Sequence, residues 1–212
     1  MSEPGIVDGD LGRRERKKLE TREALFRAAV QLFSTHGVDE TTVEDIADAV
    51  DVSARTFHRY FPSKEDVLFF DSADRRRRFA EALAARPDDE ALLDSLRSAA
   101  HGLVDAFLGD PDDDRRRLLL IRSSVTLRAK NLHHTDLLSQ IVADHAGARL
   151  AVDAGSPLPR LLAACTIAAL RTAREQSLDR PDLDAHAEVD LCFDLLADLR
   201  AATDVQRSPA GR

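Results

Sequence analysis

Residues 41–64 read TTVEDIADAVDVSARTFHRYFPSK, and the rest of the chain is organised around this stretch. A helix is expected to begin at its threonines, because Thr41 and Thr42 are each followed three residues later by an acid, which is the spacing of a capping box. The apolar positions that follow recur at the interval of one helical face: Val43, Ile46, Ala47 and Val50. The stretch therefore opens with a short amphipathic helix.

A second short helix is expected after a break at residues 51–52. Ser53 is a good N-cap for it, and Pro62 stops it, so it should span Ala54–Phe61 and bury its two phenylalanines. Its other faces carry polar side chains: Arg55, Thr56, His58 and Arg59. Two short helices joined by a tight turn, the second with a basic and hydroxyl-bearing face, form a helix-turn-helix that fits the major groove of DNA. The alternative is an ordinary helical hairpin within a bundle.

The same residues resemble the DNA-binding signature of the TetR family of bacterial regulators, which reads roughly T-T-x-x-x-I-A-x-x-x-G-V-S-x-x-T-[FL]-Y-x-[HY]-F-x-[ST]-K-[ED]. This chain supplies most of that pattern: Thr41, Thr42, Ile46, Ala47, Val52, Ser53, Thr56, Phe57, Tyr60, Phe61, Ser63, Lys64 and Glu65. Two positions depart from it. Asp51 replaces the turn glycine, and it tolerates a left-handed backbone better than most residues do. His58 replaces the usual aromatic residue, so base or phosphate contacts there are expected to differ.

The resemblance and the polar face together assign roles on double-stranded DNA. We expect Arg55, Thr56 and His58 to read base edges. Thr42, Tyr60 and Lys64 are expected to hold phosphates, with Lys64 at the capped start of the next helix. The predicted DNA-binding set also includes the flanking residues Ala54 and Arg59.

The charge distribution favours the same end of the chain. The net charge of −8 argues against nonspecific coating of nucleic acid. Residues 13–27 nevertheless carry seven Arg or Lys against three Glu, and residues 53–64 carry three bases and no acid. Basic charge thus accompanies the helix-turn-helix, where phosphates would lie. A solvated basic arm is the alternative reading.

Helical patterns and Gly or Pro breaks continue to the end of the chain, and no strand signal or internal repeat is found. We expect an all-α protein of about nine helices. Two domains are predicted: a three-helix DNA-binding head over residues 13–62 and a helical ligand-binding and dimerisation body over residues 63–203. The expected helices span about 13–36, 43–50, 54–61, 63–86, 88–108, 112–130, 135–154, 159–177 and 183–202. Gly37 is expected to close the first helix as a C-terminal glycine. Residues 1–12 and those after 203 show no periodicity.

The last two expected helices are apolar on more than one face, so each needs partners on more than one side. A second copy of the chain provides one such partner, which suits a symmetric four-helix dimer interface. The TetR resemblance implies dimerisation at the same place. A helix wholly buried in its own core is the alternative.

The body shows no catalytic constellation and no phosphate loop, so no enzyme activity, cofactor or catalytic residue is predicted. The neighbours His133, His134 and Asp136 do not form a metal site, because adjacent residues point apart on a helix.

Residues 118–131 resemble the body of acyl-CoA-responsive members of the family, the mycofactocin-system regulators above all. Six polar residues in apolar helices are therefore candidate effector contacts: His101, Arg122, Thr126, His145, Arg149 and Thr166. Arg122 or Arg149 would suit a carboxylate or phosphate.

The sequence thus predicts a homodimeric transcriptional repressor that binds a palindromic operator and is released by a small hydrophobic or acyl-type effector, such as an acyl-CoA or a fatty acid. A regulator controlled by a protein partner is the main alternative. A helical enzyme with a degenerate head is disfavoured by the intact Thr42, Thr56 and Lys64.

The longest apolar run, residues 161–170, is too short to cross a bilayer, and no signal peptide is seen. We therefore expect a cytoplasmic protein without membrane contacts.

Overall fold

The structure, a computed structural model, describes residues 8–107, 111–180 and 183–198. Within these ranges all regular secondary structure is helical, which confirms the all-α prediction. Nine are α-helices and η1 is a 3₁₀ helix: α1 (Asp8–His36), α2 (Val43–Asp48), α3 (Ala54–Tyr60), η1 (Glu65–Phe69), α4 (Ser72–Ala84), α5 (Leu92–Phe107), α6 (Pro111–Ser123), α7 (Val125–Leu150), α8 (Pro157–Asp179) and α9 (Ala185–Ala197).

The chain divides into two compact units. Unit 1 comprises the described residues up to Ser72 together with residues 115–130, and unit 2 comprises residues 73–114 and the described residues from Asn131 onward. Each unit has its own apolar core. The boundary expected after residue 62 separates two functions, DNA binding and effector binding with dimerisation. It remains a prediction about where the DNA-binding part ends.

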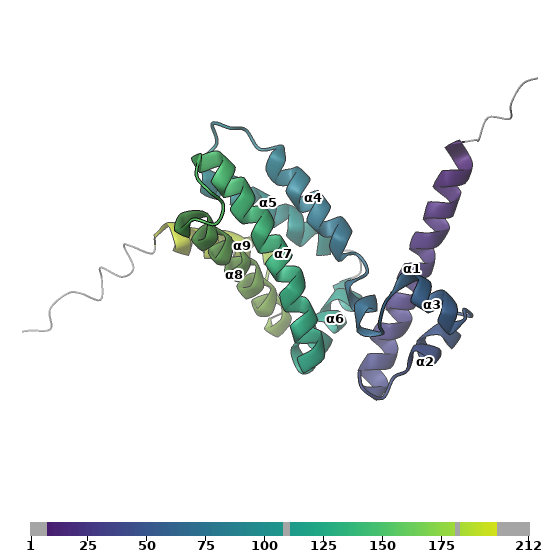
Figure 1. The fold of residues 1–212 in the computed structure, drawn as a ribbon. Helices are drawn as coiled ribbons and strands as arrows, with labels where there is room; N and C mark the ends of the chain where they lie inside the picture. The colour runs from purple at the N-terminus through teal and green to yellow at the C-terminus, as the bar shows by residue number, and fades with distance from the viewer. Residues whose placement is uncertain (1–7, 108–110, 181–182, 199–212) are drawn as a thin grey trace, which may run out of the picture. The chain divides into compact units, whose positions relative to one another are not determined.

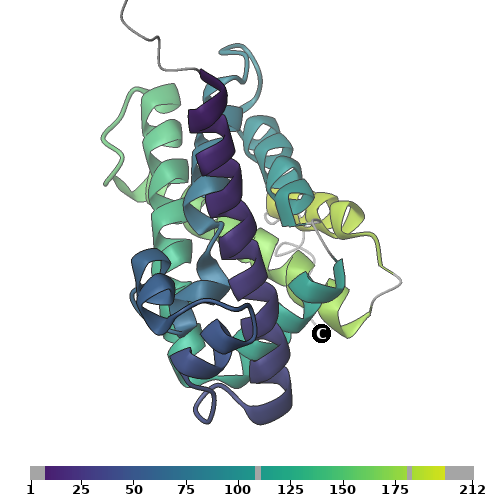
Figure 2. The same cartoon turned by 90° about the vertical axis from the view of Figure 1, so that its right-hand side faces the viewer.

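Unit 1 is built on the C-terminal half of α1. Figure 2 shows α2 and α3 lying against this half, while the first turns of α1 extend beyond them. The packed side chains come from α1, the helix-turn-helix, η1 and the α6–α7 segment: Leu25, Phe26, Ala29, Val30, Phe33, Val38, Ile46, Ala47, Phe57, Phe61, Val67, Leu68, Phe69, Leu120, Ile121 and Leu127. These residues hold α3 with its polar face outward.

Unit 2 is a bundle of α5, α8, α9, most of α4 and the longer part of α7 (Figure 1). α8 packs against α9, and both pack against α5. The core side chains are Phe79, Leu83, Leu96, Ala99, Ala100, Leu103, Val104, Val142, Ala143, Ala163, Ala169, Leu170, Ala173, Val189 and Phe193. Small residues line the buried side of α8, so its neighbours approach closely.

Three expected local features are confirmed. Gly37 ends α1 with φ +93°, and its N–H bonds the carbonyl of Phe33, as in a left-handed C-terminal cap. Asp51 has φ +55° in the turn of the helix-turn-helix, where the resemblance placed a glycine substitute. Phe61 is extended (φ −135°, ψ 129°) because Pro62 disfavours helical geometry in the residue before it. The second short helix accordingly ends at Tyr60, one residue earlier than expected.

The single helix expected from Ser63 to Arg86 is wrong. Residues 65–69 form the 3₁₀ helix η1, and α4 begins only at Ser72. Three consecutive residues, Val67, Leu68 and Phe69, are buried in the core, which one face of a regular α-helix cannot provide. The Ser72 hydroxyl donates to the carbonyl of Phe69 (2.7 Å) where the 3₁₀ segment ends.

The expected break between the sixth and seventh helices, at residues 131–134, is also wrong. The chain breaks instead at Ser124, and α7 runs without interruption from Val125 to Leu150. The Ser124 hydroxyl accepts from the backbone N–H of Leu127 (3.3 Å), so it caps the new helix. No glycine or proline marks this break, which is why composition alone did not reveal it.

The other helix ends differ from expectation by smaller amounts. The first helix begins at Asp8 rather than Arg13, the fifth begins at Leu92, and α8 spans Pro157–Asp179. α9 ends at Ala197; the expected end near residue 202 lies outside the described residues, as do residues 1–7 and the tail after 203. Among the described helices, none combines the length and apolarity that a bilayer crossing requires.

Candidate nucleic-acid interface

The start of α2 is fixed by Thr42 and Asp45. The Thr42 hydroxyl accepts from the backbone N–H of Asp45 (3.1 Å), and the Asp45 carboxylate accepts from the backbone N–H of Thr42 (2.8 Å), which is a complete capping box. Hydrogen bonds from the Thr42 side chain and backbone hold the pKa of Asp45 below its ordinary value. The sequence allowed a capping box to begin at either Thr41 or Thr42, and the chain uses Thr42. Thr41 is buried instead and donates to the carbonyl of Gly37 (2.8 Å).

The turn and the start of α3 are fixed by backbone bonds and one hydroxyl. The N–H of Val52 donates to the carbonyl of Ala47 (3.0 Å), which closes the turn around Asp51. The Ser53 hydroxyl then accepts from the backbone N–H of Thr56 (3.1 Å), so Ser53 is the N-cap that the sequence predicted. Both short helices therefore begin at hydroxyl caps on an exposed surface.

α3 separates an apolar side from a polar side. Phe57 is fully buried, and its ring lies 5.5 Å from that of Phe61. The remaining residues of the helix, all polar except Ala54, are exposed or half-buried: Ala54, Arg55, Thr56, His58, Arg59 and Tyr60. The Arg59 guanidinium donates to the Tyr60 hydroxyl (3.3 Å) and lies over its ring, 5.0 Å from the centroid. The residues expected to read bases thus share an outward face, as a reading helix requires.

Lys64 lies in a setting that the sequence did not reveal. Its ammonium donates to the carbonyls of Asp39 (3.0 Å) and Thr41 (2.8 Å), and so clamps the loop that precedes α2. The sequence placed Lys64 at the start of a long helix, whose N-terminus would itself attract a phosphate. That contribution does not apply here, because η1 is a five-residue 3₁₀ helix. An ammonium has three N–H groups, so the two carbonyl contacts leave one donor for a phosphate.

The first part of α1 provides a basic surface next to this head. All residues from Gly12 to Glu20 are exposed, and five of them are basic. Nearer the core, the Arg22 guanidinium donates to the carbonyl of Phe70 and lies 5.8 Å from the Phe61 ring centroid. Arg22 therefore serves packing in unit 1, whereas the bases before it lie on an exposed surface that an anionic partner can reach.

Two charged contacts, missed by the sequence reading, tie residues 115–130 to the rest of unit 1. Lys130 donates to the Ser63 hydroxyl (3.1 Å) and to the Asp66 carboxylate. Burial by itself would raise the pKa of Asp66, but the hydrogen bonds from Lys130 and Ser63 outweigh it and lower that pKa. Arg117 is 3% exposed and donates to Asp71 (3.2 Å).

These contacts join residues 46 to 67 positions apart, and no local spacing marks them. Only the run of leucines after Arg117 hinted that this segment is buried.

The six candidate effector residues are divided between the two units. Arg122 and Thr126 are exposed and belong to unit 1, whereas the other four belong to unit 2. Thr166 is buried on α8. His101 is held by residues of α9, at 2.7 Å from His186 and 2.8 Å from Asp190. The structure therefore assigns different surroundings to residues that the sequence grouped together.

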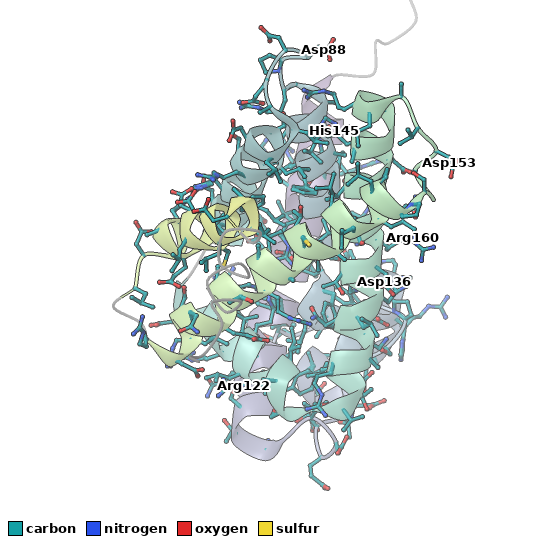
Figure 3. The ribbon with its side chains drawn as sticks, turned by 90° about the vertical axis from the view of Figure 1, so that its left-hand side faces the viewer. Asp88, Arg122, Asp136, His145, Asp153 and Arg160 are labelled. Atoms are coloured by element: carbon teal, nitrogen blue, oxygen red, sulfur yellow. The ribbon has the colours of Figure 1, made fainter. Side chains whose placement is uncertain are left out.

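His145 and Arg149 lie one turn apart on α7. Arg149 donates to the Ser95 hydroxyl (3.2 Å) and to the carbonyls of Asp88 (3.0 Å) and Glu90, so it holds the segment before α5. Figure 3 shows Asp88 in that segment and His145 on α7. His145 Nε2 is buried and has no hydrogen-bond partner among the described residues. Burial first, and the charge of Arg149 second, lower the pKa of His145 and keep its ring neutral.

A hydroxyl-capped helix pair with an exposed polar second helix, on a unit with a basic first helix, defines a helix-turn-helix DNA-binding protein. Sequence profiles give its family. Residues 25–69 match the profile of bacterial regulatory proteins of the tetR family, and residues 90–201 match that of the MftR C-terminal domain. The chain belongs to the TetR family of transcriptional regulators, which confirms the resemblance carried by residues 41–65.

Individual relatives agree with this assignment. The chain is 32% identical over 183 residues to the HTH-type transcriptional regulator TcmR of Streptomyces glaucescens, covering 83% of this chain and 81% of that protein. A TetR-family regulator from Syntrophomonas wolfei has the same fold, with a TM-score of 0.65, 16% identity and coverage of 86% of this chain and 95% of that one. FadR of Thermus thermophilus, solved with lauroyl-CoA, has a TM-score of 0.52 at 24% identity over 84% of this chain and 93% of that chain.

Proposed function

We propose that this regulator is a homodimeric repressor that binds a palindromic operator and is released by a small hydrophobic or acyl-type effector. The observation that carries the operator part is the outward polar face of α3, with Arg55, Thr56 and His58 on a helix whose start is capped by Ser53. Phosphates are assigned to Thr42, Tyr60 and Lys64 and to the basic start of α1. We expect it to act in the cytoplasm, where the bacterial chromosome lies.

The dimer part is supported by exposed apolar side chains on the last two helices. Four leucines there are each more than half exposed in one copy: Leu158, Leu161, Leu191 and Leu195. Leu191 and Leu195 lie one turn apart on the side of α9 opposite the buried Val189 and Phe193. A second copy related by a two-fold axis would cover both helices, and operator symmetry would mirror that axis.

The effector part is supported by the MftR-type body and by His145. In unit 2, a buried imidazole nitrogen without a partner costs free energy until a ligand or water bonds it. We therefore place the polar group of the effector at His145, and give Arg149, whose guanidinium holds residues 88–95, a positioning role. The lauroyl-CoA complex of the Thermus FadR makes acyl-CoAs and fatty acids the first compounds to test.

The test is selection of a binding site from random duplexes, followed by fluorescence anisotropy with the selected duplex. We expect a palindromic site and loss of binding when an acyl-CoA or fatty acid is added. Thermal-shift measurement without DNA identifies the ligand independently, because a ligand that binds the folded state raises the melting temperature. His145→Gln should abolish that rise, while Arg160→Gln, an exposed position on α8, should retain it.

Control by a protein partner is the second candidate function. The exposed Val125 and Leu132 on α7 are the observation that favours it, because they are 73% and 61% exposed and lie on neither α8 nor α9. Two results together would select this alternative. No small molecule should change operator binding, and in cell extract Leu132→Glu should bind the operator differently from wild type.

A further inference from the structure

A regular ladder of charged and polar side chains joins α5 to α9 in unit 2. Arg97, His101 and Asp105 follow one another at intervals of four residues on α5, and the same interval separates His186, Asp190 and Asp194 on α9. The helices run antiparallel, so the contacts pair in reverse order: Arg97 with Asp194 (2.6 Å), His101 with Asp190 (2.8 Å) and Asp105 with His186 (2.9 Å).

The two histidines meet at the centre of this ladder. His101 Nδ1 and His186 Nδ1 are 2.7 Å apart, which is hydrogen-bond distance. The ring centroids are farther apart, at 4.9 Å, and the planes differ by only 25°, so the rings meet through their edges. Each outer nitrogen faces a carboxylate, with His101 Nε2 at Asp190 and His186 Nε2 at Asp105.

Counting protons fixes the charge of this pair. A carboxylate only accepts, so both Nε2 atoms must carry a proton. The Nδ1–Nδ1 contact needs one further proton, because two bare nitrogens and two N–H groups repel each other at 2.7 Å. Three protons on two imidazoles make one imidazole and one imidazolium.

We propose that His101 and His186 form a binding site for one shared proton, and that this proton holds α9 against α5. The side chains of His101 and His186 are 27% and 32% exposed, so protons exchange with solvent. The site is distinct from the DNA-reading face and from His145.

The surrounding charges are those of the ladder itself. On α5 these are Arg97 and Asp105. On α9 they are Asp190 and Asp194, with Glu188 on the same helix and Asp184 bonded to the backbone N–H of His186. α8, which packs against both helices, has a buried face without titratable groups: Pro159, Ala163, Thr166, Ala169, Leu170, Ala173 and Leu178. Its Arg174 pairs with Asp114.

Removing either histidine should weaken the packing of α9 against α5, because the shared proton then has no second ring nitrogen to bond. Because α9 also carries Leu191 and Leu195, the same substitutions should weaken the dimer, a consequence that rests on the proposed function.

The experiment is thermal denaturation of the full chain at one pH and constant ionic strength, with His101→Gln, His186→Gln, the double variant and the exposed control His133→Gln. A fivefold loss of the folding equilibrium lowers the melting temperature of a chain of this size by about 2–4 °C. Each single ladder variant should show at least this loss, the double variant should lose little more than either single one, and the control should stay near wild type.

Nitrogen-15 NMR of the wild-type histidines decides the matter even if a variant fails to fold. Three of the four ring nitrogens of His101 and His186 should carry a proton, and the two Nδ1 atoms should be coupled to each other through the proton that they share. Only two protonated nitrogens, no coupling between the Nδ1 atoms, or losses of stability that simply add in the double variant would overturn the proposal. Neither measurement uses DNA or effector, so its failure leaves the proposed function untouched.

Discussion

At the scale of single residues, Arg55 is the side chain best placed to read a base. It is exposed on the second residue of α3, beside a start capped by Ser53. Arg55→Ala should relax preference at one base pair of each half-site, at a cost of about 1–3 kcal/mol. Lys17→Ala, on the exposed basic start of α1, should weaken all duplexes alike. The check is anisotropy with the selected operator and single-base variants; an unchanged preference in Arg55→Ala would show that another residue reads that position.

Lys64 has two predicted roles that one substitution separates. Its contacts with the Asp39 and Thr41 carbonyls imply that Lys64→Ala lowers the free energy of unfolding by about 1 kcal/mol. Its phosphate role predicts weaker binding to every duplex and a salt dependence reduced by about one unit. Denaturant unfolding and a salt titration of operator binding measure the two effects. A lowered stability with an unchanged salt slope would leave Lys64 a loop clamp only.

At the scale of elements, the caps of the short helices link folding to DNA binding. Ser53→Ala removes the bond to the N–H of Thr56 and should destabilise the protein by about 1 kcal/mol. Ser53→Asp keeps a capping oxygen, so its stability should stay near that of wild type. It also places a negative charge at the start of the proposed DNA-reading helix, where it would repel the polyanionic duplex, so operator binding should fall sharply. Thermal unfolding and anisotropy on both variants test this, and Ser53→Asp binding as tightly as wild type would place the DNA elsewhere.

The same scale shows what local sequence determines. Caps and turns depend on residues a few positions apart, so Ser53, Asp51 and Gly37 were predictable and their roles are confirmed. The break at Ser124 depends on one hydroxyl in a sequence that otherwise favours helix, and η1 depends on three buried residues in a row. Both are imposed by packing with distant parts of unit 1. The partners of His101 and Arg149 lie 54 to 89 residues away, so periodicity identified these residues as unusual but not their roles.

At the scale of the whole molecule, the first expectation concerns assembly. Leu195→Glu would place a charge in the proposed subunit interface and should produce monomers that bind the operator poorly. Leu132→Glu, at a similarly exposed position on α7, is the matched control and should remain dimeric. Sedimentation velocity with anisotropy measures both properties. A soluble wild-type monomer that binds the palindrome tightly would contradict the dimer.

The last expectation concerns how effector binding reaches the operator. A palindrome senses the spacing and tilt of two reading heads, so the effector must favour a different arrangement of them. The structure has three helices that cross between the units, since α4, α6 and α7 each contribute residues to both. In unit 1, Leu120, Ile121 and Leu127 are core residues, so movement of α6 or α7 would disturb the packing beneath α3.

Linkage makes this coupling measurable from either side. A coupling of about 1–3 kcal/mol would lower operator affinity roughly 5–150-fold, and the operator must lower effector affinity by the same factor. Calorimetry of the effector with free and operator-bound dimer gives one factor, and anisotropy with and without effector gives the other. Lys130→Ala removes the bonds to Ser63 and Asp66 and should reduce both factors together while leaving effector binding to the free dimer intact. Equal effector affinities for free and operator-bound protein would exclude release by that ligand, however tightly it binds, because a ligand shifts an equilibrium only by its differential affinity for the two states.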